Sequence, residues 1–168
     1  MCIELRTTRL LLRTATSADT EPLARITGEL DPEGNRIARV AALVENSRRW
    51  CLEHGYGLWV LKHRSAEGII GWCGLRPREQ PAEPELLYGL AADVRGQGLA
   101  TEAVEAVISW LFSRPQITGA WAVTDPSNTA SARLLERVGF GFERRGDFDG
   151  LDSLIYRVST ATWRARNA

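Results

Sequence analysis

A glycine-rich turn is the stretch of this sequence that points most directly to chemistry. Residues 95–98 read Arg-Gly-Gln-Gly and lie between a predicted strand and a predicted amphipathic helix. Gly96 and Gly98 allow the main chain to approach a ligand closely, and the first N–H groups of the helix would face an anion at the positive end of the helix dipole. A pyrophosphate group suits such a turn. The alternative is that both glycines serve only to form a tight turn.

Two other phosphate-binding motifs are excluded by the residues of this turn. It lacks the Lys-Ser/Thr pair of a P-loop, and it lacks the third glycine of a dinucleotide-binding fingerprint. It also lies in the middle of the chain, whereas the fingerprint opens a βαβ unit. An anion site of another class is therefore expected.

The elements that must position the turn follow from hydrophobic periodicity. Helices are expected at about residues 16–30, 37–55, 99–111 and 130–138. The first of them begins with a capping box at Thr16–Asp19. Strands are expected at residues 10–13, 58–61, 69–75, 85–90, 117–123, 140–142 and 153–159. The pair at 58–75 reads as an antiparallel hairpin, and the second half alternates strand and helix. A single α/β (α+β) domain over residues 1–168 is predicted.

Composition bounds the class of function. The chain has 168 residues, 44% hydrophobic and 25% charged, with a formal net charge of zero, so neither a nucleic-acid nor a membrane partner is expected. The three cysteines, Cys2, Cys51 and Cys73, show none of the spacings typical of a zinc site, and no metal is expected. The N-terminal apolar run is short and broken by arginines, which argues against a secretory signal or a membrane span and favours a cytoplasmic location.

Several segments resemble the GNAT superfamily of acyl-CoA-dependent N-acetyltransferases. Arg95–Ala100 is similar to the family signature (Gln/Arg)-x-x-Gly-x-(Gly/Ala) at a strand-to-helix junction. Thr8–Arg13, Asp125–Ser131 and Leu135–Phe140 resemble motifs of the branch of ribosomal-protein-alanine N-acetyltransferases (RimJ/RimL-like). That branch commonly has a tryptophan where Arg95 stands, so this position follows the wider superfamily.

The resemblance implies the GNAT fold and acetyl-CoA as cosubstrate. This fold has a central mixed, mostly antiparallel β-sheet flanked by helices, and two splayed parallel strands, here 85–90 and 117–123, hold the pantetheine arm. Main-chain N–H groups of the turn would bind the pyrophosphate, and the residues implied are Arg95, Gly96, Gln97, Gly98, Leu99, Ala100 and Thr101. A main-chain N–H near Leu90 would polarise the thioester carbonyl. Asn128 would contact the pantetheine or phosphate portion, or would simply cap a helix.

The resemblance further implies direct attack of a primary amine on the thioester within a ternary complex. Glu85 stands where several enzymes of the family carry the carboxylate that accepts the amine proton through water. The alternative is that Glu85 only solvates a strand edge after Pro84. Ser131 matches the serine of the family's Asn-x-x-Ser motif, which would protonate the departing thiolate. The alternative for Ser131 is helix capping.

The acceptor would be a protein N-terminus or a small-molecule amine, bound by a monomer or a homodimer. Carboxylates in the regions that flank the thioester in the resembled fold motivate the hypothesis of a cationic acceptor. These residues are Asp31, Glu33, Glu79, Glu83 and Glu85. Two other function classes stay open: a non-catalytic CoA-binding sensor, and a partner-binding module in which the glycines only shape a turn.

Overall fold

The computed structural model describes residues 3–26, 35–79 and 82–168 of the chain. Contacts between residues group the chain into two units, which are described in turn. The first unit comprises Met1–Arg76 and Leu87–Val107, and the second unit comprises Pro77–Leu86 and Ile108–Ala168. Among the helices of the described ranges, none is both long and apolar enough to cross a membrane.

Antiparallel strands form the frame of the first unit. They are β1 (Leu5–Arg6), β2 (Leu10–Thr14), β3 (Leu58–His63) and β4 (Gly71–Arg76). Leu12 of β2 lies opposite Leu61 of β3, and Trp59 of β3 lies opposite Cys73 of β4. Leu10 and Leu12 are both fully buried, as the two-residue period of a strand with one face on a core requires. The predicted hairpin of β3 and β4 is confirmed.

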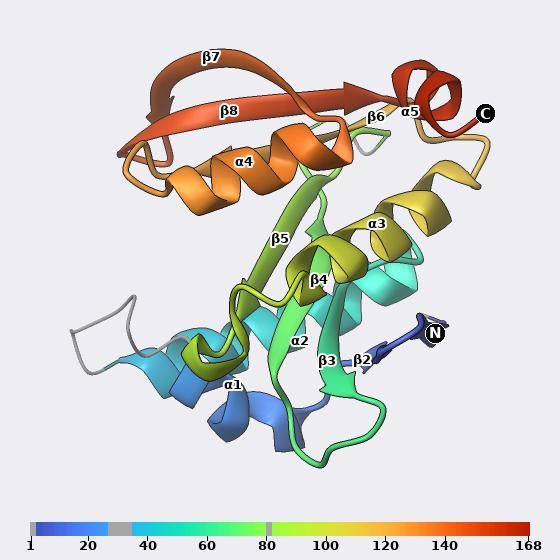
Figure 1. The fold of residues 1–168 in the computed structure, drawn as a ribbon. Helices are drawn as coiled ribbons and strands as arrows, with labels where there is room; N and C mark the ends of the chain where they lie inside the picture. Colours follow the sequence, from blue (N-terminus) through green and yellow to red (C-terminus); the bar gives the residue numbers. More distant parts are fainter. Residues whose placement is uncertain (1–2, 27–34, 80–81) are drawn as a thin grey trace. The chain divides into compact units, whose positions relative to one another are not determined.

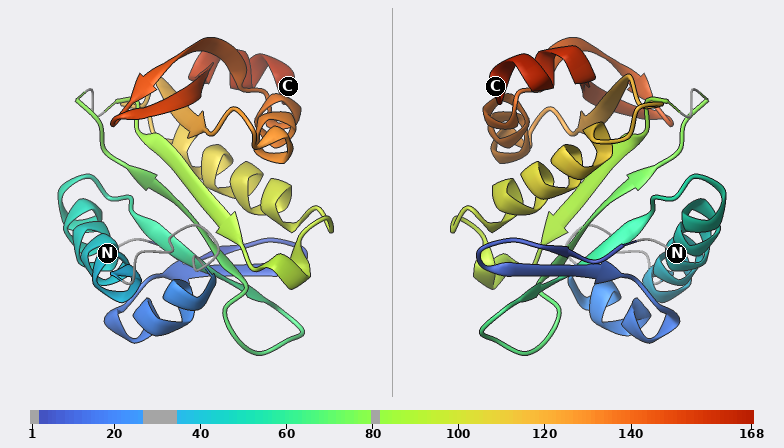
Figure 2. Two further views of the ribbon diagram at one scale, coloured as in Figure 1. Left: turned by 90° about the vertical axis from the view of Figure 1, so that its left-hand side faces the viewer. Right: turned by 90° about the vertical axis from the view of Figure 1, so that its right-hand side faces the viewer.

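Two helices cover one face of this frame, as Figure 2 shows. They are α1 (Thr20–Ile26) and α2 (Arg36–Glu53). Val40 and Val44 of α2 lie one helical turn apart and pack in the same buried cluster as Leu58 of β3. The helical spacing of apolar residues that predicted α2 is therefore the spacing that buries it.

The start of the first helical segment is fixed by one buried carboxylate. Asp19 accepts a hydrogen bond from the main-chain N–H of Thr16 at 2.8 Å, as the predicted capping box requires. The guanidinium of Arg13 donates to the same carboxylate at 2.7 and 2.8 Å. Burial alone would raise the pKa of Asp19, but the hydrogen bonds from Arg13 and Thr16 outweigh burial and lower it.

The second unit contains three whole strands and two helices, of which one follows the first strand in the chain and the other follows the last strand (Figure 1). They are β6 (Gly119–Thr124), β7 (Gly141–Phe148), β8 (Leu151–Ser159), α4 (Thr129–Val138) and α5 (Thr160–Arg166). β8 pairs antiparallel with both β6 and β7. The predicted helix end at Gly139 is confirmed, because this residue has a left-handed φ of 103° and closes α4.

Hydrogen bonding connects the described strands in the order β1-β2-β3-β4-β5-β6-β8-β7. β5 (Glu85–Leu90) and β6 form the parallel pair of this otherwise mostly antiparallel sheet, with Glu85 opposite Trp121. The predicted fold class is therefore confirmed. The short β1 and the C-terminal α5 were not predicted, and the expected continuation of the first helix beyond Ile26 lies outside the described residues.

Candidate functional site

The glycine-rich turn has the backbone geometry of an anion site. It follows β5 and a single 3-10 turn (Ala92–Val94) and leads into α3 (Leu99–Phe112). Gly96 and Gly98 have left-handed φ angles of 76° and 78°, which side-chain-bearing residues rarely adopt. Residues 95–98 are exposed, and the first N–H groups of an α-helix have no acceptor within the helix. The structure thus brings the predicted residues of this segment together at one exposed helix N-terminus.

Two of the predicted residues hold the turn against β5. The side chain of Arg95 donates from Nε to the main-chain oxygen of Leu90 at 3.1 Å. This bond ties the start of the turn to the last residue of the strand. Arg95 therefore has a structural role in addition to the one implied by its place in the signature.

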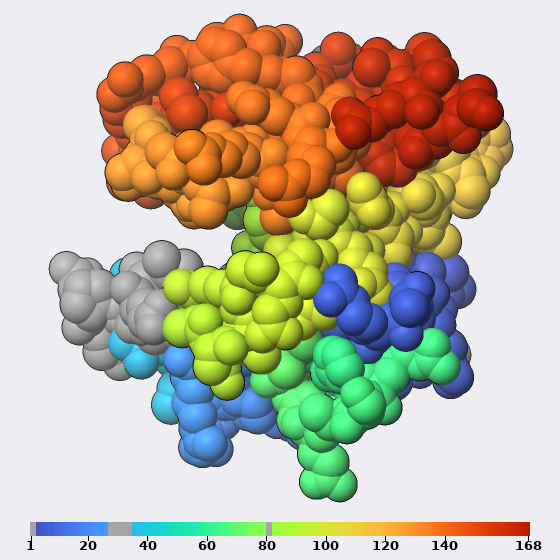
Figure 3. Space-filling model, viewed as in Figure 1, coloured from blue at the N-terminus to red at the C-terminus, as the bar shows by residue number. Residues whose placement is uncertain are grey.

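A network from the connection between β1 and β2 fixes the other side of the turn. Glu102, in the first turn of α3, accepts hydrogen bonds from Thr7 Oγ1 at 2.5 Å, from Arg9 N at 2.8 Å and from Arg9 Nε at 2.7 Å. Arg9 also donates from Nη1 to the main-chain oxygen of Gln97 at 2.9 Å. Figure 3 shows the yellow-green segment that leads into α3 at the surface, beside dark-blue atoms of the N-terminal segment.

This network places positive charge at the turn. A Cβ atom at Gly98 would lie 3.5 Å from Nη2 of Arg9, so the guanidinium is immediately beside the glycine. Burial alone would raise the pKa of Glu102, but the hydrogen bonds from Thr7 and Arg9 outweigh burial and lower it. Sequence reasoning missed Arg9 and Glu102 because they are 93 residues apart and no local pattern joins them.

The two polar residues predicted near the start of α4 form its cap. Asn128 is the N-cap residue, and its Oδ1 accepts a hydrogen bond from the main-chain N–H of Ser131 at 3.0 Å. The capping role is therefore present for Asn128. Ser131 takes part in this cap through its main-chain N–H, and Asn128 supplies the side-chain acceptor.

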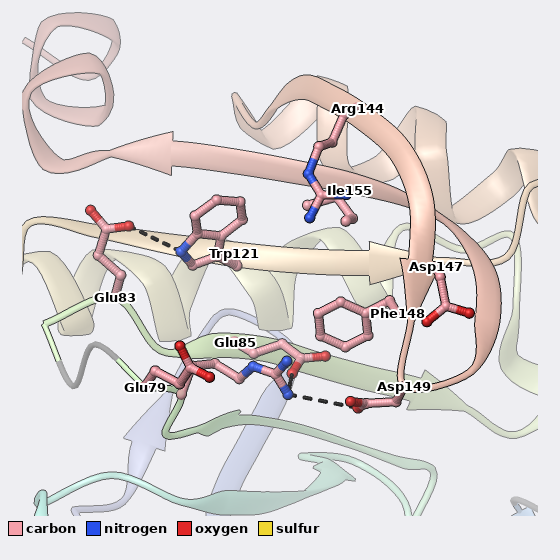
Figure 4. A pocket seen from close by; sticks show the side chains of 10 residues that line it. Glu79, Glu83, Glu85, Trp121, Arg144, Asp147, Phe148, Asp149 and Ile155 are labelled. Atoms are coloured by element: carbon pink, nitrogen blue, oxygen red, sulfur yellow. Dashed lines mark hydrogen bonds and ion pairs between the residues drawn. The ribbon is translucent and has the colours of Figure 1, made fainter.

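A cavity of about 400 Å³ lies within the second unit, and Figure 4 shows its lining. The lining contains five carboxylates, from Glu79, Glu83, Glu85, Asp147 and Asp149. It also contains two guanidinium groups and three apolar side chains, from Arg78, Arg144, Trp121, Phe148 and Ile155. Three of the five acidic residues of the cationic-acceptor hypothesis meet here, whereas Asp31 and Glu33 lie outside the described residues.

Glu83 has a structural role on one side of this cavity. Its buried carboxylate accepts hydrogen bonds from Thr118 Oγ1 at 3.2 Å, from Trp121 Nε1 at 3.0 Å and from Arg157 Nε at 3.0 Å, and Nη2 of Arg157 is a further donor. The guanidinium of Arg157 holds the pKa of Glu83 below its ordinary value, and the other two donors act in the same direction.

Glu85 has a different environment. Its side chain is only 4% exposed and lies at the cavity, with Oε2 at 3.5 Å from Nη1 of Arg78. The same Nη1 lies 3.7 Å from Oδ2 of Asp149, and the guanidinium stacks on the ring of Phe148 with Cζ 4.3 Å from the ring centroid. Arg78 thus lies among an aromatic face and two carboxylates.

The hairpin of β7 and β8 carries half of the cavity lining, and sequence reasoning missed these residues as it missed Arg78, which lies between β4 and β5. Asp149 and Gly150 have φ angles of 53° and 84°, and Phe148 pairs with Leu151, so the hairpin has a two-residue loop of the left-handed type. Such a loop is short and well defined, so it holds Phe148 and Asp149 in place. The Asp-Gly dipeptide between two alternating segments was the available sequence signal.

Comparisons with known proteins agree with these features. Residues 9–141, which include parts of both units, match the family model described as an acetyltransferase (GNAT) domain. YkkB, an uncharacterized protein of Bacillus subtilis (strain 168), is 32% identical over 96 residues, which cover 55% of this chain and 56% of that protein. An aminoglycoside N(6')-acetyltransferase type 1 of Klebsiella pneumoniae is 36% identical over 66 residues, which cover 39% of this chain and 32% of that protein.

A solved structure extends the likeness over nearly the whole chain. It is a RimL ribosomal L7/L12 alpha-N-protein acetyltransferase in complex with coenzyme A, with a TM-score of 0.77 and 15% identity over 94% of this chain and 98% of that one. At this identity the likeness concerns the fold. The matches to YkkB and the aminoglycoside enzyme span about half of those proteins' lengths or less.

Proposed function

Because the chain belongs to the GNAT acetyltransferase family, we propose that it is an acetyl-CoA-dependent N-acetyltransferase in which a primary amine attacks the thioester directly within a ternary complex. The left-handed turn at Gly96 and Gly98, at the N-terminus of α3, carries this proposal. It has the family signature, exposed N–H groups and the guanidinium of Arg9 beside it. The family match includes residues of both units, which supports one acetyltransferase domain over residues 1–168 and the expected cytoplasmic location of such an enzyme.

The residues of the turn fit the pyrophosphate of acetyl-CoA. A Cβ atom at Gly96 would meet nothing within 4 Å, so this side of the turn is open to a ligand. The main-chain N–H groups from Gly96 to Thr101 would hold the phosphates, whereas the N–H of Arg95, expected among them, donates to the main-chain oxygen of Ala92 at 3.3 Å. A main-chain N–H near Leu90 would polarise the thioester carbonyl. Asn128 is proposed to contact the cofactor from the start of α4. When bound, acetyl-CoA supplies the acetyl group as a reactive thioester.

Two side chains are proposed to move protons. The amine must lose a proton as its nitrogen bonds to the acetyl carbon, and Glu85 at the cavity is the proposed acceptor of that proton. The carbon–sulfur bond breaks in the same reaction, and the Ser131 hydroxyl is the proposed donor to the departing thiolate. The cap by Asn128 supports this role, because it holds Ser131 through the main chain.

The acceptor is proposed to be a protein N-terminus or a small-molecule amine. Two of the similar proteins named above support one choice each, since one is a ribosomal L7/L12 alpha-N-protein acetyltransferase and the other is an aminoglycoside N(6')-acetyltransferase. Both candidate acceptors are amines, so the reaction is of the same class whichever of them this chain uses.

The test is amine-dependent release of CoA thiol from acetyl-CoA, with mass spectrometry of the amine. The proposal expects thiol release that depends on the amine and a product heavier by one acetyl group. Acetyl-CoA binding with no transfer to a broad panel of small amines and N-terminal peptides would favour the CoA-binding sensor. Failure to bind CoA would favour the partner-binding module.

A further inference from the structure

We propose that the cavity of the second unit recognises a cationic group of the acceptor, which takes the place that the Arg78 guanidinium occupies on the ring of Phe148. This inference rests on the proposed function, because it names the class of amine that the same enzyme would use. That class is an amine with a second ammonium or guanidinium group, such as a polyamine or a guanidino-amine.

The geometry of Arg78 is that of a cation in a recognition site. Its Cζ lies 4.3 Å from the Phe148 centroid, well within the range of about 6 Å for attraction between a cation and an aromatic face. Its Nη1 lies 3.5 Å from Glu85 and 3.7 Å from Asp149. An aromatic face with two flanking carboxylates is an arrangement that binds guanidinium and ammonium groups in general.

The contacts of Arg78 with the two carboxylates are also long enough for a ligand cation to replace them. Charge-assisted N–H···O bonds are typically about 2.7–2.9 Å, and both of its carboxylate distances exceed that range. The Arg157–Glu83 pair nearby is tighter, with Nε at 3.0 Å and a second donor from Nη2. The carboxylate contacts therefore hold Arg157 more tightly than Arg78, which can yield its place to a ligand cation.

The charge of the lining favours a cation over an anion. Five carboxylates face two guanidinium groups, which leaves an excess of three negative charges if all are ionised. Arg157 neutralises Glu83 and reduces the excess to two. A ligand with two or more positive groups therefore matches the cavity, and a ligand with one does so only in part.

The first experiment is calorimetric titration of the full chain, without acetyl-CoA, using spermidine and agmatine as probes and butylamine as the singly charged control. Both probes are expected to bind at least about tenfold more tightly than butylamine. Added salt should weaken the binding of both probes. Equal affinity for the three amines would overturn the proposal.

The second experiment separates a stand-in cation from a structural ion pair. Arg78→Ala should tighten spermidine binding by about tenfold, because it removes the competing cation and leaves the aromatic face open. Arg144→Ala makes the same change of charge in the lining without touching the stack, and it should change affinity by less than about threefold. Arg78→Ala binding no more tightly than Arg144→Ala would overturn the proposal.

Two further variants keep the test sharp if Arg78→Ala folds poorly. Phe148→Leu and Asp149→Asn should each lower the affinity for spermidine by about threefold, since each removes one element of the cation site. Asn tolerates the left-handed φ of Asp149, and Glu143→Gln on the same hairpin is the matched control. Unchanged affinity in both of these variants would contradict the inference, and circular dichroism would confirm that each is folded.

The inference and the proposed function fail in different ways. Acetylation of butylamine and spermidine at equal rates, unaffected by Phe148→Leu, would overturn the cation site and leave the enzyme. Spermidine binding that Arg78→Ala tightens, with no acetyl transfer to any amine, would support the cation site and overturn the enzyme.

Discussion

Glu102 is the side chain through which the connection between β1 and β2 holds the start of α3, and its replacement by glutamine tests that role. The variant keeps one acceptor oxygen for Thr7 Oγ1 and Arg9 N, but it places an NH₂ group where Oε2 now accepts from Arg9 Nε at 2.7 Å. One charge-assisted hydrogen bond is lost and two donors face each other.

The expected loss of stability follows from that single bond. A hydrogen bond to a charged group contributes about 1.5–3 kcal/mol. Solvent screens this one, because the side chain of Arg9 is 41% exposed, and we expect the free energy of unfolding to fall by about 1–1.5 kcal/mol. Glu105→Gln makes the same change at an exposed position of the same helix and should alter it by less than about 0.5 kcal/mol.

The same pair of variants gives a pH test. The pKa of Glu102 in the folded chain lies below its ordinary value of 4.5, so its contribution is fully present above that value and is lost as the pH falls through the lower folded pKa. The free energies of urea unfolding of the wild type and Glu102→Gln should therefore differ at neutral pH and converge as the pH falls through the lowered pKa of Glu102. A loss equal to that of Glu105→Gln, or a difference that stays constant with pH, would refute the role assigned to Glu102.

Three other variants address the turn, the proposed acid and the buried ion pair. Gly98→Glu should abolish CoA binding by adding strain and negative charge at the turn, whereas Gly68→Glu, at another exposed left-handed glycine, should bind CoA normally in calorimetry; equal affinities would sink the turn assignment. Ser131→Ala keeps the main-chain N–H that the cap uses, so acetyl-CoA affinity should hold while kcat falls in thiol-release assays; an unchanged kcat would count against the acid role. Arg157→Leu should lower the free energy of unfolding by about 2 kcal/mol in urea titrations, less than for a fully buried pair because Arg157 is 39% exposed; a loss below about 0.5 kcal/mol would contradict the importance of its contact with Glu83.

The parts of the fold that could be predicted are those with a local pattern. Val40 and Val44 predict α2, because a helix places them on one face. Gly139 predicts the end of α4, because a left-handed residue is needed there. The C-terminal α5 has no such pattern, since Trp163 is its one buried side chain. The two-residue β1 is too short for any period to appear.

The residues of the candidate site likewise divide into those that a local sequence pattern predicts and those that it does not. The glycines at 96 and 98 are adjacent in sequence to the helix that they serve, so their geometry could be predicted. The contacts of Arg9 with Glu102 and of Arg78 with Phe148 join distant segments, and only the fold shows which side chains meet. The acidic residues near the cavity were noticed as one group, but the structure separates Glu83, which is bound to Arg157, from the rest.

Calorimetric titration of the full chain with acetyl-CoA, with CoA and ATP as comparisons, tests the central claim most directly. The proposed function predicts saturable binding of acetyl-CoA and CoA at one site per chain and no comparable binding of ATP. Absence of acetyl-CoA and CoA binding would contradict it.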